Sequence, residues 1–262
     1  MAGAVRLEHD GALARVVLSH PGKLNAMSRA MWRELRDVFA QLQGAGTACR
    51  CIVVQGDGEA FCAGGDIAEY DGFRFDEASL RAFHDDDVWG GLQAVLDCDI
   101  PVVAAIRGVC MGAGIEIASC CDLRLAAATA QFGAPIARLG FPMAPREAEL
   151  VARVAGEATA RQLLLEAAVL DGREMKARGF VQHLAEEGDF FASLEMLVQR
   201  VVALAPQAAR ANKRTLRALR EQHDPQRRAA ALQELAGAYR YAPAAEHREG
   251  IAAFLEKRRP RF

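Results

Sequence analysis

The sequence lacks several features that mark common functional classes. No apolar run approaches the roughly 18 residues of a membrane span. Lysine and arginine (32) do not outnumber aspartate and glutamate (34), so the chain lacks the basic surplus of nucleic-acid-binding proteins. The first 22 residues have no apolar core like that of a signal peptide, because charged residues interrupt them. We therefore expect a cytoplasmic protein that binds neither membrane nor nucleic acid.

Metal-binding patterns are also missing. None of the six histidines occurs in H-x-x-x-H or H-E-x-x-H spacing, and no two of the seven cysteines form a C-x-x-C pair. We predict no metal site, and we interpret the odd number of cysteines as buried thiols in a reducing compartment.

The order of segments indicates an α/β fold with a helical C-terminal region. Short apolar runs predict strands, and apolar residues at helical spacing predict helices. We expect a core over residues 1–190 and a helical region over 191–262, since the chain beyond about residue 190 is nearly all amphipathic helix. The expected strands are 14–20, 49–56, 100–108, 122–133 (with a turn) and 178–185, and the expected core helices are 28–44, 76–98, 112–121, 144–156 and 158–170.

Two Gly-rich stretches share one pattern: a buried strand, small residues, and a turn that opens into a helix. They are "CIVVQGDGEAFCAGGDI" and "PVVAAIRGVCMGAGIEIA". Small residues let the backbone approach a ligand closely, and a helix start offers unpaired N–H groups. Two such loops brought together can aim two N–H donors at one oxygen, which is an oxyanion hole. Close packing of the sheet is the simpler explanation of the glycines. A phosphate-binding P-loop is excluded, because no G-K-S/T follows.

Several motifs together resemble the crotonase (enoyl-CoA hydratase/isomerase) superfamily. They are "HPGKLNAM", "FCAGGDI", "IPVVAAIRGVCMGAGIEIASCCDLRLAA", "AQFGAPIARLG" and the ending "EHREGIAAFLEKRRPRF", in the order and spacing of that family. The resemblance implies a spiral of ββα units whose C-terminal helices build a homotrimer or a dimer of trimers. It also implies an acyl-CoA thioester as substrate, with coenzyme A as part of that substrate and no further cofactor.

The resemblance also assigns roles to the two loops. The amides of Ala63 and Ala113 would hold the thioester oxygen. The loop formed by Ala63, Gly64, Gly65 and Asp66 would pass along CoA. Lys257 falls where some members contact a CoA phosphate, although a solvated lysine near the chain end is an equally good interpretation.

Glu116 is the residue that we expect to carry the proton-transfer chemistry. It is the only charge between Arg107 and Asp122, about one helical turn beyond the second loop. It matches one of the two catalytic glutamates of true hydratases. The second glutamate would follow Pro135, where this sequence has Ile136, which cannot transfer a proton.

A few nearby side chains are candidates to replace the missing glutamate. Glu147 is a candidate acid or base, although a glutamate in the first turn of a helix is also favoured by the helix dipole. Arg138 and Arg146 are candidates to orient a substrate carboxylate. His84 is followed by three aspartates on the segment that flanks the acyl pocket in this family, and a solvated acidic helix face is its alternative.

The sequence therefore predicts an acyl-CoA-transforming enzyme. Hydration of a 2-enoyl-CoA, or the reverse dehydration, is the leading reaction. A double-bond isomerase is second, since moving one proton between two carbons can use one carboxylate. An acyl-CoA hydrolase or decarboxylase is third, and a catalytically silent acyl-CoA-binding module is the alternative from another functional class.

Overall fold

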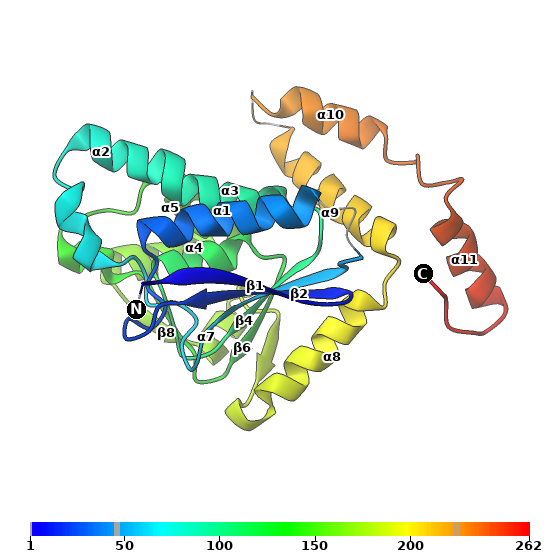
Figure 1. The fold of residues 1–262 in the computed structure, drawn as a ribbon, viewed down its shortest axis with the longest axis horizontal. Coiled ribbons are helices and arrows are strands. Elements are labelled where there is room, and N and C mark those ends of the chain that lie inside the picture. The colour runs from blue at the N-terminus through cyan, green and yellow to red at the C-terminus, as the bar shows by residue number, and fades with distance from the viewer. Residues whose placement is uncertain (1, 45–47, 223, 225) are drawn as a thin grey trace.

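The computed structural model describes residues 2–44, 48–222, 224 and 226–262. Figure 1 shows a central sheet with helices packed on it and further helices at the C-terminal end of the chain. This arrangement confirms the α/β fold with a C-terminal helical region that the sequence predicted.

A six-stranded sheet forms the centre of the fold. Its strand order is β1-β2-β3-β4-β6-β9, and all neighbouring strands run parallel except β1 and β2. Parallel strands covered on both faces carry continuous apolar runs, which explains why the inner strands read as buried in the sequence. The strands are β1 (Ala4–Asp10), β2 (Leu13–Ser19), β3 (Cys51–Gly56), β4 (Val102–Ile106), β6 (Leu123–Ala127) and β9 (His183–Ala185).

Three short strands form a second sheet, in the order β5-β7-β8. The chain runs from β4 into β5 and α4, and from β6 into β7 and then α5, so each turn gives one strand to each sheet. A bridge between Cys62 and Cys110 continues this pattern into the loop after β3. The repetition is the expected spiral of ββα units. The short strands are β5 (Val109–Met111), β7 (Gln131–Gly133) and β8 (Val169–Asp171).

Helices cover the large sheet. In Figure 1, α1, α2 and α3 lie on one side of it, and α1 packs against both α3 and β1. A π-helical turn at Phe83–Val88 joins α2 to α3, so the predicted helix over 76–98 is one continuous helical segment. The core helices are α1 (Arg29–Gly44), α2 (Glu77–Ala82), α3 (Trp89–Asp97), α4 (Ala113–Cys120), α5 (Pro145–Ala155), α6 (Glu157–Arg161) and α7 (Gly172–Ala177).

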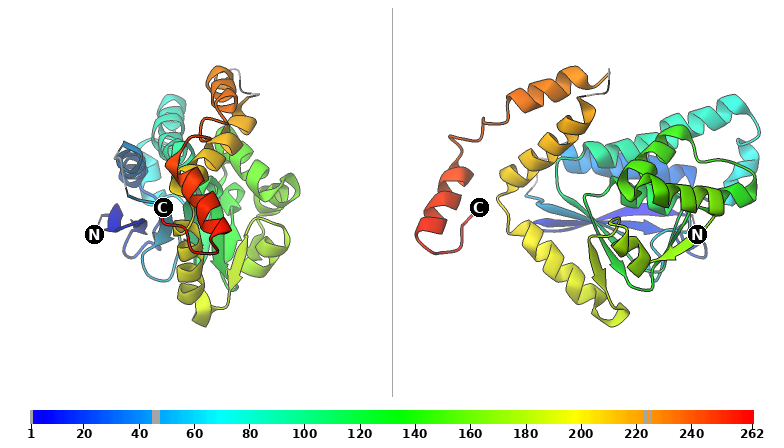
Figure 2. Two further views of the ribbon diagram at one scale, coloured as in Figure 1. Left: turned by 90° about the vertical axis from the view of Figure 1, so that its right-hand side faces the viewer. Right: turned by 180° about the vertical axis from the view of Figure 1, so that it is seen from behind.

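The C-terminal helices are α8 (Phe190–Val202), α9 (Pro206–Glu221), α10 (Arg228–Ala236) and α11 (Ala245–Leu255). α9 is fixed to the core by basic side chains: Lys213 pairs with Asp122 at 2.7 Å, and Arg217 donates to the carbonyl oxygens of Leu96 and Asp97. Those carbonyls end α3 and have no partner within that helix. α10 packs on α9, and Figure 2 shows α10 and α11 extending away from the sheets.

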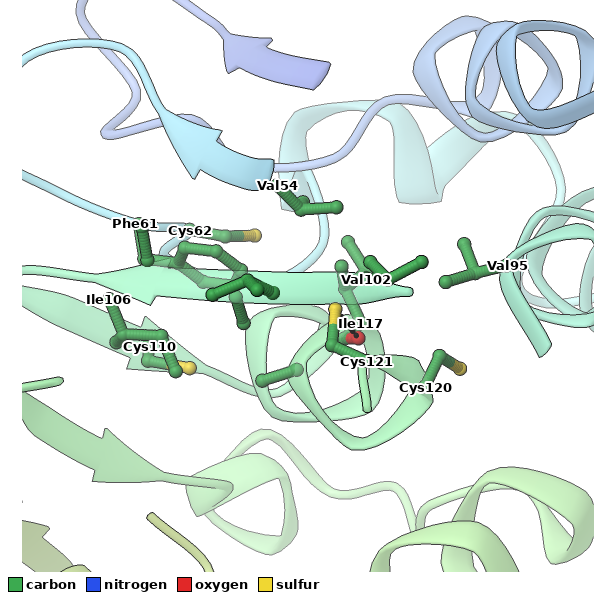
Figure 3. Packing of buried hydrophobic residues seen from close by; sticks show 14 of the residues in the cluster. Val54, Phe61, Cys62, Val95, Val102, Ile106, Cys110, Ile117, Cys120 and Cys121 are labelled. Carbon is green, nitrogen blue, oxygen red and sulfur yellow. Dashed lines mark hydrogen bonds between the residues drawn. The ribbon is translucent and has the colours of Figure 1, made fainter. Parts of the chain in front are cut away.

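The core is built from side chains of the central strands and of the helices on both faces. Figure 3 shows side chains from β3, β4 and α4 packed together, with several cysteines among them. All seven cysteines are buried and unpaired. Burial raises the pKa of Cys51, Cys62 and Cys121 to about 12, so these thiols stay protonated and behave as small apolar groups.

The structure corrects several predicted elements. The helix expected over 158–170 is wrong at its end, because Ala167 adopts a left-handed conformation (φ 55°) and the next residues form β8. The strand expected over 178–185 comprises only β9, and α7 before it was not predicted. β1 was also missed, although Gly11 (φ 57°) forms the turn that pairs it with β2. Strands of three residues depend on distant partners, which a local pattern does not reveal.

Candidate active site

A cavity of about 230 Å³ lies where the two Gly-rich loops meet the start of α4. Small residues of both loops form one wall, and apolar and aromatic side chains form the others. Of the described residues that line it, Glu116 is the only acidic one. The lining includes Trp32, Ala63, Gly64, Gly65, Tyr70, Arg74, Phe83, His84, Met111, Gly112, Ala113, Glu116, Ile136, Phe141 and Met143.

The two loops lie side by side because they are hydrogen-bonded directly to each other. The amide of Met111 donates to the carbonyl oxygen of Cys62 at 2.9 Å. A Cβ atom on Gly114 would lie 2.8 Å from the same oxygen, so only glycine allows this approach. Gly64 (φ 114°) and Gly112 (φ 45°) adopt conformations that other residues rarely reach. The glycines therefore bring the loops together and leave room for a ligand above them.

The amides on this wall require one correction to the predicted oxyanion hole. The N–H of Ala63 donates to the carbonyl oxygen of Leu24 at 3.0 Å, so it is not available to a ligand. Among the described residues, the N–H groups of Gly65 and Ala113 have no protein acceptor, and both residues line the cavity. Ala113 begins α4, where the amides have no partner within the helix. In the first loop, Gly65 rather than Ala63 therefore has an amide free to face a ligand.

The segment "HPGKLNAM" supports the first loop, a role that sequence reasoning missed. Leu24 (φ 46°) and Asn25 (φ 61°) adopt left-handed conformations, which are costly for leucine. The buried amide of Asn25 donates to the carbonyl oxygens of Asp57 (2.9 Å) and Ala60 (2.8 Å). These bonds hold the turn before the loop, while the Leu24 carbonyl holds Ala63. The signal available in the sequence was an asparagine, which tolerates this conformation, beside a turn.

Glu116 lies on the first turn of α4 and faces the cavity, as the sequence predicted. Its side chain is half-buried and has no cationic partner among the described residues. Burial, and after it the negative charge of Glu147, raises the pKa of Glu116 to about 8. The group is therefore mostly protonated at neutral pH, and it is able both to donate and to accept a proton near that pH.

The position of the missing second glutamate also faces the cavity. Ile136 lies on a short 3-10 helix (Pro135–Leu139) and contributes an apolar surface. Glu147 does not line the cavity. It is buried, and its carboxylate lies 3.0 Å from Nδ1 of His84, which does line the cavity.

The remaining predicted residues lie outside the cavity wall. Asp66 caps the following 3-10 helix and pairs with Lys23 at 2.6 Å. Lys257 is exposed beyond α11, and its predicted contact with CoA stays a prediction. Arg138 donates to the carbonyl oxygen of Ala167.

Arg146 stacks over the ring of Trp89, and neither it nor Arg138 lines the cavity. Both are therefore unsuited to orient a substrate carboxylate there.

Arg74 and Tyr70 line the cavity although sequence reasoning did not single them out. The Arg74 guanidinium lies 3.6 Å from the ring centre of Phe141 and 4.4 Å from that of Tyr70. Burial lowers the pKa of Arg74 below its usual value. The stacking keeps a cation in an otherwise apolar wall through contact with aromatic faces.

The described part of the chain has neither a cluster of metal ligands nor a helix that could span a membrane. No group of three or more His, Cys, Asp or Glu side chains is placed to hold a metal ion. No helix there is both long and apolar enough to cross a bilayer.

The sequence matches a known protein family and is similar to several named hydratases. Residues 8–262 match the enoyl-CoA hydratase/isomerase family. The chain is 31% identical over 253 residues to mevalonyl-coenzyme A hydratase SIDH of Beauveria bassiana, covering 94% of this chain and 89% of that protein. It is 28% identical over 258 residues to crotonyl-CoA hydratase of Syntrophomonas wolfei, covering 98% and 96%.

Solved structures of similar fold include members of the same family. The enoyl-CoA hydratase/carnithine racemase from Magnetospirillum magneticum superposes with a TM-score of 0.92 at 34% identity, covering 99% of this chain and 95% of that one. Pseudomonas aeruginosa AtuE superposes with a TM-score of 0.87 at 33% identity, covering 98% of both chains.

Proposed function

The chain belongs to the enoyl-CoA hydratase/isomerase family, and from that premise we propose that it hydrates a 2-enoyl-CoA or catalyses the reverse dehydration. One observation carries the proposal: two unpaired amides and one protonatable carboxyl group line the same cavity. They belong to Gly65, Ala113 and Glu116. The cavity volume of about 230 Å³ is below the roughly 300–1,000 Å³ of drug-sized sites, which favours a short acyl group.

The amides would act on the thioester carbonyl. When water adds to the β-carbon, electrons of the double bond move toward the thioester oxygen and an enolate forms. N–H donors placed at that oxygen stabilise the charge as it develops, and each is typically worth about 10²–10³ in rate. The donors from Gly65 and Ala113 come from rigid backbone, so they need no reorganisation during the reaction.

Glu116 would complete the addition. With a pKa of about 8 it carries a proton at neutral pH and is able to deliver it to the α-carbon of the enolate. In the reverse direction its carboxylate removes the same proton. The reaction adds or removes water and transfers protons, so it requires no redox cofactor and no resident metal.

A double-bond isomerase is the second candidate, and Ile136 favours it. A proton shift between the α- and γ-carbons needs one carboxylate and no bound water, which suits a cavity whose second catalytic position is apolar. Turnover of a 3-enoyl-CoA to the 2-enoyl isomer, without hydration of the product, would support this reaction over the first.

The C-terminal helices support an assembly of several copies, which we propose is a trimer or a dimer of trimers. Large apolar side chains are exposed on and between them: Leu216, Leu232, Tyr239, Tyr241, Ile251 and Leu255. A surface of this kind marks an interface between proteins. In such an assembly Lys257 would serve the CoA site of a neighbouring copy. The unpaired buried thiols fit a reducing compartment, so we propose a cytoplasmic location.

Hydration of crotonyl-CoA tests the proposal, followed by the loss of enoyl absorbance. We expect Glu116→Gln to lower kcat by about 10² or more and to leave the affinity for the CoA ester nearly unchanged. Glu149→Gln, an exposed carboxylate on α5, is the matched control and should behave as wild type. Tight binding of CoA esters without turnover of any thioester in a panel would instead indicate a binding module.

A further inference from the structure

A histidine of the cavity wall forms a pair with a buried carboxylate at the proposed site. Nδ1 of His84 is 3.0 Å from Oε1 of Glu147, and the two residues are 63 positions apart in the sequence. The Glu147 side chain is 3% exposed, whereas that of His84 is 23% exposed. His84 comes from the π-helical turn between α2 and α3, and Glu147 from the first turn of α5.

The orientation of the pair follows from its hydrogen bond. An ionised carboxylate only accepts, so Nδ1 of His84 carries the hydrogen and donates it to Glu147. In the neutral form of the ring, Nε2 then holds the free lone pair of the imidazole. His84 lines the same cavity as Glu116 and Ile136, so this lone pair belongs to a group of the cavity in which the second glutamate is missing.

The buried carboxylate of Glu147 depends on His84 as its partner. Burying a carboxylate is unfavourable unless it is paired with a cation or well hydrogen-bonded. Among the described residues, His84 is the only side chain that hydrogen-bonds to or forms an ion pair with Glu147. An imidazole on a cavity wall with a buried carboxylate behind it is the arrangement that orients a histidine for proton transfer.

We propose that His84 is the base that deprotonates the attacking water, in place of the glutamate that Ile136 replaces, and that Glu147 positions it. The proposal rests on the hydratase function proposed above. Of the pair, only His84 would touch the reacting water, and Glu147 would act through it.

The proton and electron movements balance without another reactant. One O–H bond of water breaks, its proton moves to Nε2 of His84, and the oxygen forms a bond to the β-carbon. The electrons of the double bond move onto the thioester oxygen, where the Gly65 and Ala113 amides would hold them. The enolate then takes the proton of Glu116 at its α-carbon. Transfer of one proton from His84 to Glu116 through solvent restores both groups.

Two reactions of the full-length protein separate the role of His84 from that of Glu116. The first is hydration of crotonyl-CoA, which needs both groups. The second is exchange of the α-hydrogen of butyryl-CoA with D₂O, followed by NMR, which needs the amides and Glu116 but no attacking water. The variants are His84→Gln, Glu116→Gln and, as a matched control from the same turn, Asp85→Asn, an exposed side chain.

We expect His84→Gln to lower kcat for hydration by about 10²–10⁴ while its α-exchange stays within about threefold of wild type. Glu116→Gln should lose both reactions, and Asp85→Asn neither. Hydration by His84→Gln at the wild-type rate would overturn the proposal. Equal loss of both reactions in His84→Gln would also overturn it, because the residue would then be structural. Absence of both reactions in the wild type would refute the hydratase function itself, and the proposal with it.

Glu147→Gln tests the positioning role. We expect it to lower kcat for hydration by about 10-fold or more with little change in KM, since the imidazole loses its charged partner. The negative charge of Glu147 also raises the pKa of Glu116. The decline of kcat at high pH should therefore move to lower pH in this variant. A wild-type kcat and an unmoved pH profile would overturn the role of Glu147.

Discussion

Replacing Glu116 by glutamine should stabilise the protein, and the gain should grow with pH. Burial raises the pKa of this carboxyl group from 4.5 to about 8, so between these pH values the folded state binds a proton that the unfolded state releases. Unfolding then becomes easier as the pH rises, by about 1.4 kcal/mol for each pH unit. Below pH 4.5 the carboxyl group is protonated in both the folded and the unfolded state and does not reduce the free energy of unfolding. As the pH rises from 4.5 toward 8, it lowers that free energy progressively.

The size of the effect follows from the two pKa values of Glu116, 4.5 and about 8. The penalty is about 1 kcal/mol at pH 5, about 3 kcal/mol at pH 7 and on the order of 5 kcal/mol at pH 9. Glutamine has nearly the same shape and does not ionise, so Glu116→Gln removes the penalty. We expect the difference in unfolding free energy between variant and wild type to grow by about 4 kcal/mol from pH 5 to pH 9.

Chemical denaturation at pH 5, 7 and 9 measures this difference. The protein concentration must be the same throughout, because assembly of copies would add to the apparent stability. Glu149→Gln on the same buffers is the control and should show no growth with pH. A difference between Glu116→Gln and wild type that does not change with pH would refute the reasoning, because the carboxyl group would then ionise as readily in the folded chain as in the unfolded one. Higher stability combined with lost turnover is the usual property of a functional residue.

Four further predictions follow from the same site and from the C-terminal helices. In steady-state assays, kcat for hydration should fall as the pH rises through about 8, because the proton donor Glu116 ionises there, and a pH-independent kcat would contradict this role. Ile136→Glu should raise hydratase activity by supplying a second carboxylate to the cavity; no change would mean that the pocket is shaped for another reaction. Gly114→Ala should lower turnover by about 10-fold or more and lower Tm, because the new Cβ would lie 2.8 Å from the carbonyl oxygen of Cys62. The control Gly188→Ala should change neither, because a Cβ at residue 188 has no atom within 4 Å. Light scattering should give the mass of a trimer or hexamer, and a monomer would contradict the role of the C-terminal helices.

Much of the fold was predictable because its signals are local. The buried β-branched runs of β3 and β4 and the periodic apolar residues of α1 lie within single segments, so the sequence alone identified them. The short strand β8 was missed because its signal is not local. A three-residue strand is stabilised by a partner elsewhere in the chain, here β7, more than by its own residues.

Some features of the candidate site are likewise set by local sequence, and others by contacts between distant segments. The sequence by itself determined that two Gly-rich loops precede helices and that Glu116 follows the second loop by one turn, because these relations are set by local spacing. Only the tertiary structure decided which amides remain free, since Ala63 is occupied by a carbonyl from residue 24 while Gly65 is not. It also joined His84 to Glu147 and raised the pKa of Glu116. Hydrogen-bond satisfaction and desolvation depend on every group that surrounds an atom, and most of those groups are distant in the sequence.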